Sequence, residues 1–534
     1  MATAGERPAS ARIAPDLPSI AELEQRHATI GSVSVHVANI FDLDDPREDR
    51  ALYRLANRLH MRTREGVIRA QLLFTSGEPL NEHKLRESER ILRTRHYLND
   101  AWVVAERYDA ESNVVDLAVT VRDVWTLSPG LSIGRSGGSN ASRISFEEQN
   151  LLGQGSSVAV TRARNVDRTS TTFSYADTNL LRSWWQLRIN YSDNSDGRVR
   201  AGSLARPFTS LDTRSAIGFD GISGASVVSR YSNGAIADQF EAQRSYFDSY
   251  YGWSRGLKDG WTQRWFAGAR YDSTVFTRRA DIAEVPLTLP EDRRFAYPFL
   301  GWQLIEDRYT QGENYDLIGR TEDLYFGRSL YAELGYSPRG RDRQGSALLG
   351  RFTALAGWAF DPRRDLFANA SLDGRLQDGA ARNVVLNASA RYFQRINEHQ
   401  LFYAALTGVA THRLDADRQV LLGGDTGLRG YPLRFQGGTS SLLATAEHRV
   451  FTDWYPFRLA RVGGAVFFDA GRTWGRDYLG VMPVGLLKDV GLGLRIGNNR
   501  SALGSVLHVD LSYALDGPPG TKRFQVTVET KDRF

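Results

Sequence analysis

The chain has 534 residues, with 67 Lys and Arg against 62 Asp and Glu and a formal net charge of +5. Cysteine is absent, which excludes structural disulfides, thiolate nucleophiles, Cys-based zinc sites and iron–sulfur clusters. The charges are interspersed, so we expect a solvated surface and no nucleic-acid partner. Apolar stretches long enough for a transmembrane helix are lacking, whereas a transmembrane β-barrel stays open because its strands alternate in polarity.

Residues 1–29 are polar and contain Pro8, Pro15 and Pro18. No apolar segment follows Met1, so this stretch does not read as a secretion signal in this numbering. We expect a flexible N-terminal tail. The spacing of Ser19 and Glu22 fits a capping box, so the alternative is a short helix that begins there.

Residues 30–126 have the pattern of a small α+β domain in the order β-α-α-β-β. Valines alternate with polar residues over 33–37, which predicts a half-buried strand. Two helices are expected next, one from Thr63 to Leu72 and one that begins after Asn81, a good N-cap residue. Two strands close the domain, at 102–108 and 114–121, joined by a polar turn.

From residue 127 to residue 534 the sequence shows short alternating segments and no convincing helix, which predicts a mainly β structure. In 507–515 and 524–528, for example, every second residue is apolar and the residues between them are polar. Charges such as Asp510 and Arg495 fall inside these patterns, where they are costly in a dry core and tolerated in a wet lumen. We therefore predict a transmembrane antiparallel β-barrel, with up to about 20 strands by the number of segments.

The loop expected around 413–439 and the strands that follow it contain the most specific residues. The loop contains the motif Gly427, Leu428, Arg429, Gly430 and Tyr431. A later strand contains Phe467, Asp469 and Gly471 on one face, and Glu447 lies on the polar face of the strand between them. Because polar faces point into a barrel, we expect the loop to fold into the lumen and Arg429 to pair with Asp469 and Glu447.

With these motifs the chain resembles, over about residues 30–534, the BamA/TamA-type superfamily of outer-membrane assembly factors and two-partner-secretion transporters, also called bacterial surface antigen barrels. The matching motifs are the loop usually written [VL]RG[FY] and the strand motif FxDxG. The resemblance implies a barrel of 16 strands and makes residues 30–126 a single POTRA domain. The terminal strand, with Phe524, Val526, Val528 and Phe534, resembles the signal that the outer-membrane assembly machinery reads.

The function that this resemblance implies is the insertion of outer-membrane proteins or the translocation of polypeptides across the bacterial outer membrane. The POTRA domain would lie in the periplasm and capture clients, and the Arg429 loop would stabilise or gate the barrel. Its partners would be outer-membrane lipids, unfolded or extended client polypeptides at the POTRA edge strands, and possible periplasmic or lipoprotein partners. A passive channel, or a structural or lipid-handling barrel, remains the alternative.

An enzymatic reading has little support in the sequence. Residues 130–134 match G-x-S-x-G, but no helix is expected after Ser132, and a nucleophile elbow requires one. The nine histidines show no paired ligand spacing. We expect no catalytic, cofactor-binding or metal-binding residues.

Overall fold

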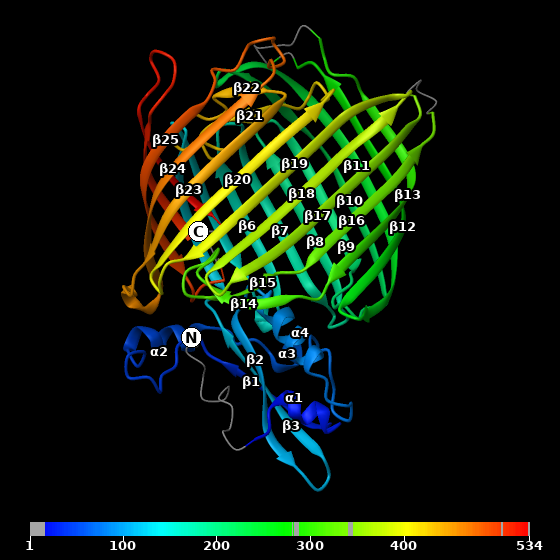
Figure 1. Cartoon of the computed structure of the whole chain (residues 1–534), viewed down its shortest axis with the longest axis vertical. Helices are drawn as coiled ribbons and strands as arrows, with labels where there is room; N and C mark the ends of the chain where they lie inside the picture. The colour runs from blue at the N-terminus through cyan, green and yellow to red at the C-terminus, as the bar shows by residue number, and fades with distance from the viewer. Residues whose placement is uncertain (1–16, 280, 282–287, 340–344, 503–505, 532–534) are drawn as a thin grey trace.

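The structure is a computed structural model that describes residues 17–279, 281, 288–339, 345–502 and 506–531. A small N-terminal domain lies below one end of a large β-barrel (Figure 1). We call this end of the barrel proximal and the opposite end distal. Within the described residues, no helix combines the length and the apolar character needed to span a membrane.

The N-terminal domain packs helices against a three-stranded sheet. Its sheet has the order β1-β3-β2, with β1 parallel and β2 antiparallel to the central β3. Four residues of β3 that alternate along the strand, at positions 115, 117, 119 and 121, are fully buried in the core. The elements are α1 (Ile20–Gln25), β1 (Thr29–Ala38), α2 (Ala51–Leu59), α3 (Glu65–Arg69), α4 (Glu82–Arg93), β2 (Leu98–Asp109) and β3 (Val114–Asp123).

The predicted elements of this domain are largely confirmed, with three corrections. Asn81 caps α4 by accepting a hydrogen bond from the Lys84 N–H at 2.9 Å. The tail predicted over 1–29 is wrong in its second half, because the capping box at Ser19 starts α1, and Leu23 of α1 is buried in the core. The helix predicted from Thr63 to Leu72 is only the five residues of α3, and α2 was not predicted.

The remaining strands form a closed barrel in which every neighbouring pair is antiparallel. It has 20 strands, the upper end of what the number of segments predicted, and the 16 strands implied by the resemblance are wrong. The barrel closes where β27 meets β4, at the single pair Val528 and Arg135 within the described residues. The strands are β4 (Leu127–Ser136), β5 (Ser139–Glu148), β6 (Ser156–Arg164), β7 (Thr169–Leu180), β8 (Trp185–Asn194), β9 (Gly197–Arg206), β10 (Ser215–Ser232), β11 (Ala235–Lys258), β12 (Trp261–Thr277), β13 (Arg293–Glu306), β16 (Arg328–Ser337), β17 (Ala347–Asp361), β18 (Arg364–Gln377), β19 (Ala380–Arg395), β20 (Gln400–His412), β23 (Ser440–Phe451), β24 (Ala460–Trp474), β25 (Leu487–Asn498), β26 (Val506–Ala514) and β27 (Phe524–Lys531).

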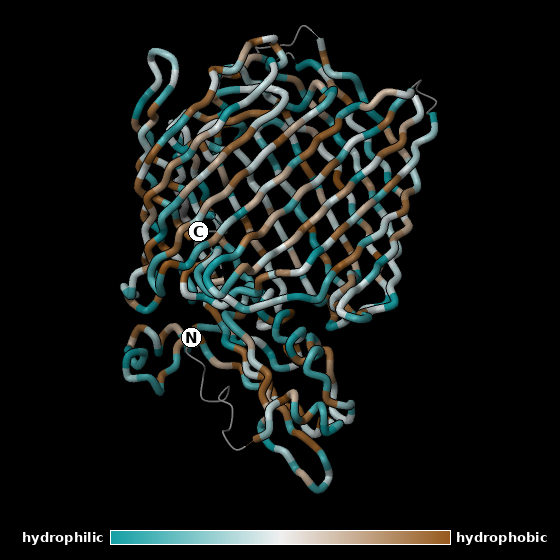
Figure 2. Tube along the Cα trace, in the orientation of Figure 1, coloured by the Kyte–Doolittle hydropathy of each residue, from teal (hydrophilic) through white to brown (hydrophobic). Residues whose placement is uncertain are grey.

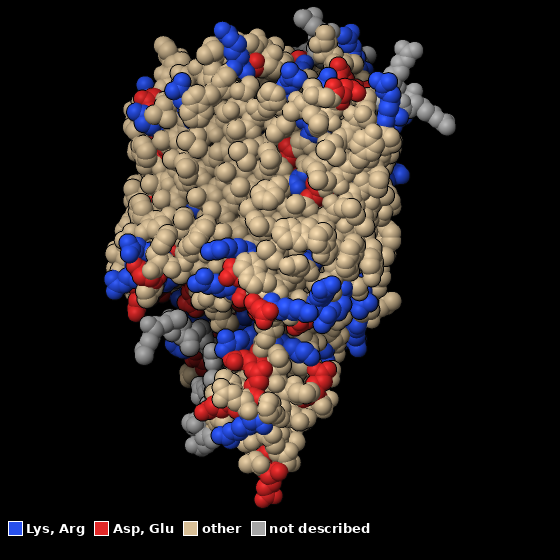
Figure 3. All heavy atoms as spheres, turned by 45° about the vertical axis from the view of Figure 1, so that its right-hand side comes forward, with Lys and Arg blue, Asp and Glu red and all other residues tan. Residues whose placement is uncertain are grey.

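The outer face of the barrel is apolar and the inner face is polar. On β27, Phe524 and Val526 are 66% and 44% exposed, whereas Gln525 and Thr527 between them are buried. Brown and pale residues alternate along the strands in Figure 2. On the face of the barrel seen in Figure 3 a wide band is mostly uncharged, and charged residues gather at its two ends. This is the surface that a transmembrane β-barrel presents to lipid.

Two connections between barrel strands carry hairpins of their own. At the proximal end, the connection from β13 to β16 forms β14 (Tyr309–Glu313) and β15 (Thr321–Tyr325). At the distal end, the connection from β20 to β23 forms β21 (Val420–Leu422) and β22 (Gln436–Gly438). Two short 3-10 helices, η2 (Leu151–Gly153) and η3 (Pro456–Arg458), lie in proximal turns.

Candidate functional site: an arginine-anchored loop in the barrel lumen

The distal loop at residues 413–439 folds inward and buries its tip against the barrel wall. A tight turn, in which the Tyr431 N–H donates to the Leu428 carbonyl at 3.0 Å, presents Arg429 between two apolar anchors. Leu428 and Tyr431 are fully buried and pack with Leu422, Leu487 and Ala514. The apolar side chains therefore fix the backbone on either side of the guanidinium.

Arg429 lies among three carboxylates of neighbouring strands. Its Nε donates to Asp469 Oδ2 at 2.7 Å and its Nη2 donates to Asp469 Oδ1 at 3.0 Å, a bidentate contact. Its Nη1 lies 2.9 Å from Glu447 Oε1 and 3.5 Å from Asp510 Oδ2. The face of the guanidinium stacks on Phe467, with Cζ 3.4 Å from the ring centroid.

Burial of Arg429 would by itself lower its pKa, but the attraction of Asp469, and then of Glu447 and Asp510, raises the pKa above its usual range. Arginine stays charged in proteins, and the ion pairs with Asp469 and Glu447 hold this charge at the wall of the barrel. The strand residues Phe467, Asp469 and Glu447 lie where the alternation of the sequence predicts, on the lumen side.

Two further arginines complete the cluster, and the sequence analysis did not predict them as members. Arg449 donates to Glu447 Oε2 at 2.8 Å, and Arg495 donates to Asp510. Both arginines are almost fully buried. The alternation of polar and apolar residues along each strand could have identified them. By this alternation Arg449, Arg495 and Asp510 fall on the polar faces of β23, β25 and β26.

The glycines of the motif allow the loop to lie directly on the wall. A Cβ on Gly430 would lie 2.6 Å from the Cβ of Asp489, so a side chain would push the loop away from β25. Gly427 has φ +112°, a backbone conformation that side chains rarely adopt. Gly471 lies beside the loop, where a Cβ would meet the side chains of Leu422 and Leu443. The hydroxyl of Tyr431 donates to the Lys488 carbonyl at 2.8 Å and so ties the turn to β25.

The rest of the loop is paired with other strands of the barrel wall. Asp415 pairs with Arg375 of β18 at 2.7 Å, and Asp417 pairs with Arg293 of β13 at 2.7 Å. Closer to the distal rim, Arg434 pairs with Asp167 in the turn between β6 and β7 at 2.7 Å. The loop is thus held from several sides of the barrel.

Below this loop the lumen contains a polar cavity of about 660 Å³. Ion pairs such as Arg270 with Asp248 and Glu333, and Arg351 with Asp373, line or border it. Its charged walls suit water, polar polypeptide backbone or ions rather than an apolar ligand.

The β14–β15 hairpin lies across the proximal mouth, between the barrel and the N-terminal domain. Toward the barrel wall, the Tyr315 hydroxyl donates to Asp365 of β18 at 2.6 Å, and Asp316 pairs with Arg391 of β19 at 2.6 Å. Toward the N-terminal domain, Asp323 pairs with Arg93 of α4 at 2.8 Å. Both ends of the lumen therefore carry inserted chain, and the sequence analysis did not predict this hairpin.

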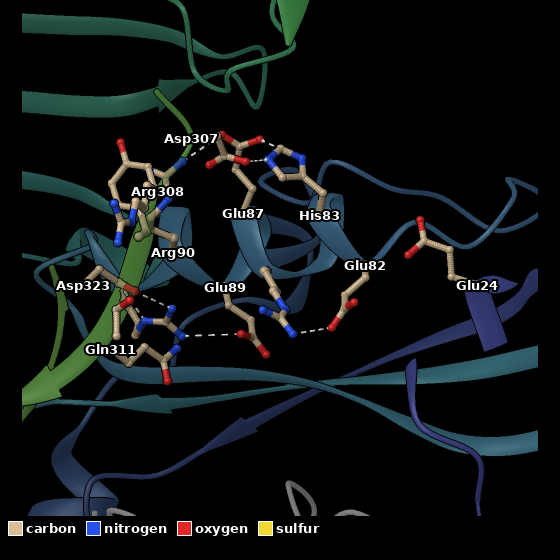
Figure 4. Close-up of a pocket in the computed structure, with 14 residues that line it drawn as sticks. Glu24, Glu82, His83, Glu87, Glu89, Arg90, Asp307, Arg308, Gln311 and Asp323 are labelled. Carbon is tan, nitrogen blue, oxygen red and sulfur yellow. Dashed lines mark hydrogen bonds and ion pairs between the residues drawn. The ribbon is translucent and has the colours of Figure 1, made fainter. Parts of the chain in front are cut away.

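Helix α4 forms a charged contact with the barrel at the same end (Figure 4). His83 Nε2 lies 2.9 Å from Asp307 Oδ2, at the start of the β13–β16 connection. The hydrogen bond to Asp307, and then the nearby Glu87, raise the pKa of His83. Among the described residues, His83, Glu87 and Asp212 are the group whose ligand-type atoms lie close enough to hold a metal ion, within 4.8 Å.

Other residues named by the sequence lie as follows. The G-x-S-x-G segment at 130–134 is part of strand β4, so it forms no strand–helix elbow. Phe524, Val526 and Val528 lie on β27, with the first two exposed on its outer face. Phe534 lies outside the described residues.

Comparisons with known proteins return similarity to solved structures alone. No family model matches the chain, and no curated protein matches it. The chain is similar to BamA from Haemophilus ducreyi lacking POTRA domains 1–3, with 12% identity, a TM-score of 0.39, and coverage of 93% of this chain and 84% of that chain. It is also similar to CdiB from Acinetobacter baumannii, with 12% identity, a TM-score of 0.45, and coverage of 94% and 73%.

A third similar structure is CdiB from Escherichia coli, with 10% identity, a TM-score of 0.39, and coverage of 94% of this chain and 90% of that chain. By its own strand pairing the chain is a closed, 20-stranded antiparallel β-barrel with an α+β N-terminal domain.

Proposed function

We propose that this protein inserts β-barrel proteins into the bacterial outer membrane or passes polypeptides across it, with its N-terminal domain acting as a periplasmic POTRA domain. The observation that carries the proposal is the loop at 413–439, anchored in the lumen by Arg429 on Asp469 and Glu447. A barrel whose lumen holds a loop anchored to its wall suits controlled passage better than free diffusion. The motif resemblance stated above supports the same role.

The N-terminal domain offers an edge strand for an extended client. In the sheet order β1-β3-β2, one edge of β2 is paired with no other strand of the described chain. Part of that edge is occupied, because the Val103 N–H donates to Glu89 at 2.6 Å and the Ala101 carbonyl accepts from Arg93 at 3.1 Å. Strand addition by a client would therefore use the part of β2 beyond Val103, toward Tyr108.

The barrel offers a second edge at the β27–β4 closure. One residue pair joins these strands in the described chain, whereas β26 and β27 pair over their full overlap from Val506 to Tyr513. Opening this seam would expose backbone groups that can template a new strand. A client that meets the free edge of β2 could then continue along β4 or β27.

Site-specific photocrosslinking in intact cells tests the proposed client binding. A photoreactive residue at Arg107, on the outer part of β2, is expected to capture unfolded or extended outer-membrane polypeptides. Arg86 on α4 is a matched control, because both arginine side chains are highly exposed, at 78% and 75%. Equal capture at both positions, or capture at neither, would contradict client binding at the β2 edge.

The second candidate is a passive channel, which the polar cavity of about 660 Å³ in the lumen favours. Planar-bilayer conductance separates the two functions. For the proposed function we expect small, fluctuating conductance that changes in Arg429→Ala, because the loop then loses its anchor. Large, steady pores that Arg429→Ala leaves unchanged would establish the channel instead.

A further inference from the structure

Helix α2 has an exposed apolar face that nothing within the described residues covers. Leu52, Leu55 and Leu59 are 61%, 48% and 67% exposed. At 100° per residue the three leucines fall within an arc of about 60° on one side of the helix. Met61, just beyond the helix, is 51% exposed as well. A cluster of large apolar side chains on a small domain marks a surface that contacts another phase or another molecule.

The other sides of α2 have different characters. Tyr53 and Ala56 face inward, where Tyr53 stacks on Phe41 with ring centroids 4.4 Å apart and the pair packs with Trp125 and Leu459. Arg54, which pairs with Asp49, and Arg58 lie on the third side, and both are exposed. The helix thus has an inner face held by the barrel rim, an outer apolar face and a basic flank.

Helix α2 lies below the proximal end of the lipid-facing wall of the barrel. In Figure 1 α2 lies just below the proximal rim, under the wall formed by β23–β25. The Tyr53 hydroxyl donates to the Phe457 carbonyl in the β23–β24 turn at 2.8 Å. In this turn the side chains of Trp454 and Phe457 are 64% and 74% exposed. Higher on the same strands, Leu442 and Val466 are exposed on the outer face.

We infer that α2, together with Trp454 and Phe457, lies on the phospholipid surface around the proximal end of the barrel and anchors the N-terminal domain to it. Leucine, tryptophan and phenylalanine beside arginine are the composition of helices that lie in a membrane interface. Aromatic rings are favoured at the level of the headgroups, where Trp454 and Phe457 end the lipid-facing strands. The arginine flank fits lipid phosphates. The inference depends on the barrel spanning a membrane and not on what the barrel transports.

The chain is well suited to a direct test because it contains no cysteine. Single variants Leu55→Cys, Leu59→Cys and Ser112→Cys are labelled with a nitroxide in the full-length protein, reconstituted in vesicles of zwitterionic and anionic phospholipid. Ser112 is the control, since it lies exposed in the β2–β3 turn at the far tip of the domain. Collision rates of each label with oxygen and with a water-soluble nickel complex report its depth.

We expect labels at Leu55 and Leu59 to collide several-fold more with oxygen and several-fold less with nickel than the label at Ser112. A label at Arg54, on the basic flank of the same helix, should stay accessible to nickel, which also shows that the helix keeps its orientation. The inference is overturned if the label at Leu55 is as accessible to nickel as that at Ser112. It is equally overturned if that label is shielded from both reagents, which would mean that protein covers the face.

Discussion

At the scale of single residues, the wall beside the loop is a compact array of buried opposite charges. Arg429, Arg449 and Arg495 alternate with Glu447, Asp469 and Asp510, and every member of this set is buried. Such charges are costly to bury singly, and each is tolerated because its partners lie within hydrogen-bonding or ion-pair distance. The array acts as one unit, so the loss of a single member leaves the others uncompensated.

The variant Arg429→Ala should destabilise the barrel and release the loop tip. Removal of one partner of a buried ion pair typically costs about 3–5 kcal/mol, because the remaining charges stay buried. The stability of Arg429→Lys should lie between that of Arg429→Ala and that of the native protein, since an ammonium keeps the charge but cannot bind Asp469 in a bidentate manner. Denaturant unfolding in detergent, with hydrogen exchange of residues 423–431, would measure both effects.

Arg434→Ala is the matched control in the same loop. Arg434 pairs with Asp167 nearer the rim, and its side chain is 19% exposed against 7% for Arg429. Its loss should cost clearly less than the loss of Arg429, because partly solvated pairs contribute about 1 kcal/mol or less. Equal losses in the two variants would show that the carboxylate cluster is not the main anchor.

His83 should make the contact between α4 and the barrel depend on pH. Asp307, and then Glu87, hold the folded-state pKa of His83 above its ordinary value of 6.5. The imidazolium therefore stabilises the docked domain fully below about pH 6.5, and this contribution is lost as the pH rises through the higher folded-state pKa. The urea midpoint of the N-terminal domain in the native protein should thus approach that of His83→Gln as the pH increases.

The expected difference at low pH is below about 1 kcal/mol, because the His83 side chain is partly solvated. His399 is a useful control, since it lies beside the carboxylate of Asp453 at 3.2 Å and both of these residues belong to the barrel. His399→Gln should leave the urea midpoint of the N-terminal domain unchanged at every pH. If the difference between the urea midpoints of the native protein and His83→Gln is the same at all pH values, this role for His83 is ruled out.

At the scale of elements, two inserted segments decide how open the barrel is. The distal loop is fixed to β24 by Arg429, to β18 by Asp415 and to β13 by Asp417. The β14–β15 hairpin is fixed to the barrel through Asp316 and to α4 through Asp323. Since the hairpin contacts both the barrel and the N-terminal domain, a movement of that domain would be transmitted to the proximal mouth of the barrel.

Replacement of residues 309–325 by a short Gly-Ser linker should open the proximal mouth. The strands β13 and β16 are hydrogen-bonded neighbours, so a short turn can join them without the hairpin. Single-channel conductance in planar bilayers should rise several-fold relative to the native protein. The same linker in place of residues 476–485, a distal connection, is the control and should change conductance little; equal changes would show that the hairpin does not obstruct the mouth.

At the scale of the whole molecule, the barrel of 20 strands closes at the contact in which the fewest described residues are paired. Val528 and Arg135 are the pair found between β27 and β4 within the described residues, whereas β25 and β26 are paired continuously from Asp489 to Gly497. Backbone pairing is the main bond between barrel strands, so this closure is where the wall should open first. Under the proposed function, this seam is the place where we expect a client to leave laterally into the membrane.

A disulfide across the seam tests lateral exit without other cysteines in the chain. The double variant Arg135→Cys and Val528→Cys, oxidised in cells, should strongly reduce client assembly, and reduction should restore it. The control pair Leu494→Cys and Val509→Cys lies on directly paired residues of β25 and β26. Undiminished assembly with the seam locked would show that clients leave by another route.

The sequence by itself determined the class of the fold and the side of each residue. Alternation in β24 and β26 predicted that Asp469 and Asp510 face inward, because side chains in a strand point to opposite faces in turn. The fully buried valines of β3 and the Asn81 cap of α4 follow from the same local rules. These features depend on residues close together in the sequence, so one sequence is enough to predict them.

Only the tertiary structure decided which distant residues meet. The contacts of Arg429 with Asp510, of Asp323 with Arg93, and of α2 with the barrel rim join residues far apart in the chain. Pattern analysis missed α2 because its leucines find no core in the domain, and it missed the β14–β15 hairpin because a short polar hairpin has no periodic signal. The closure of 20 strands depends on every pairing at once, which local alternation does not specify.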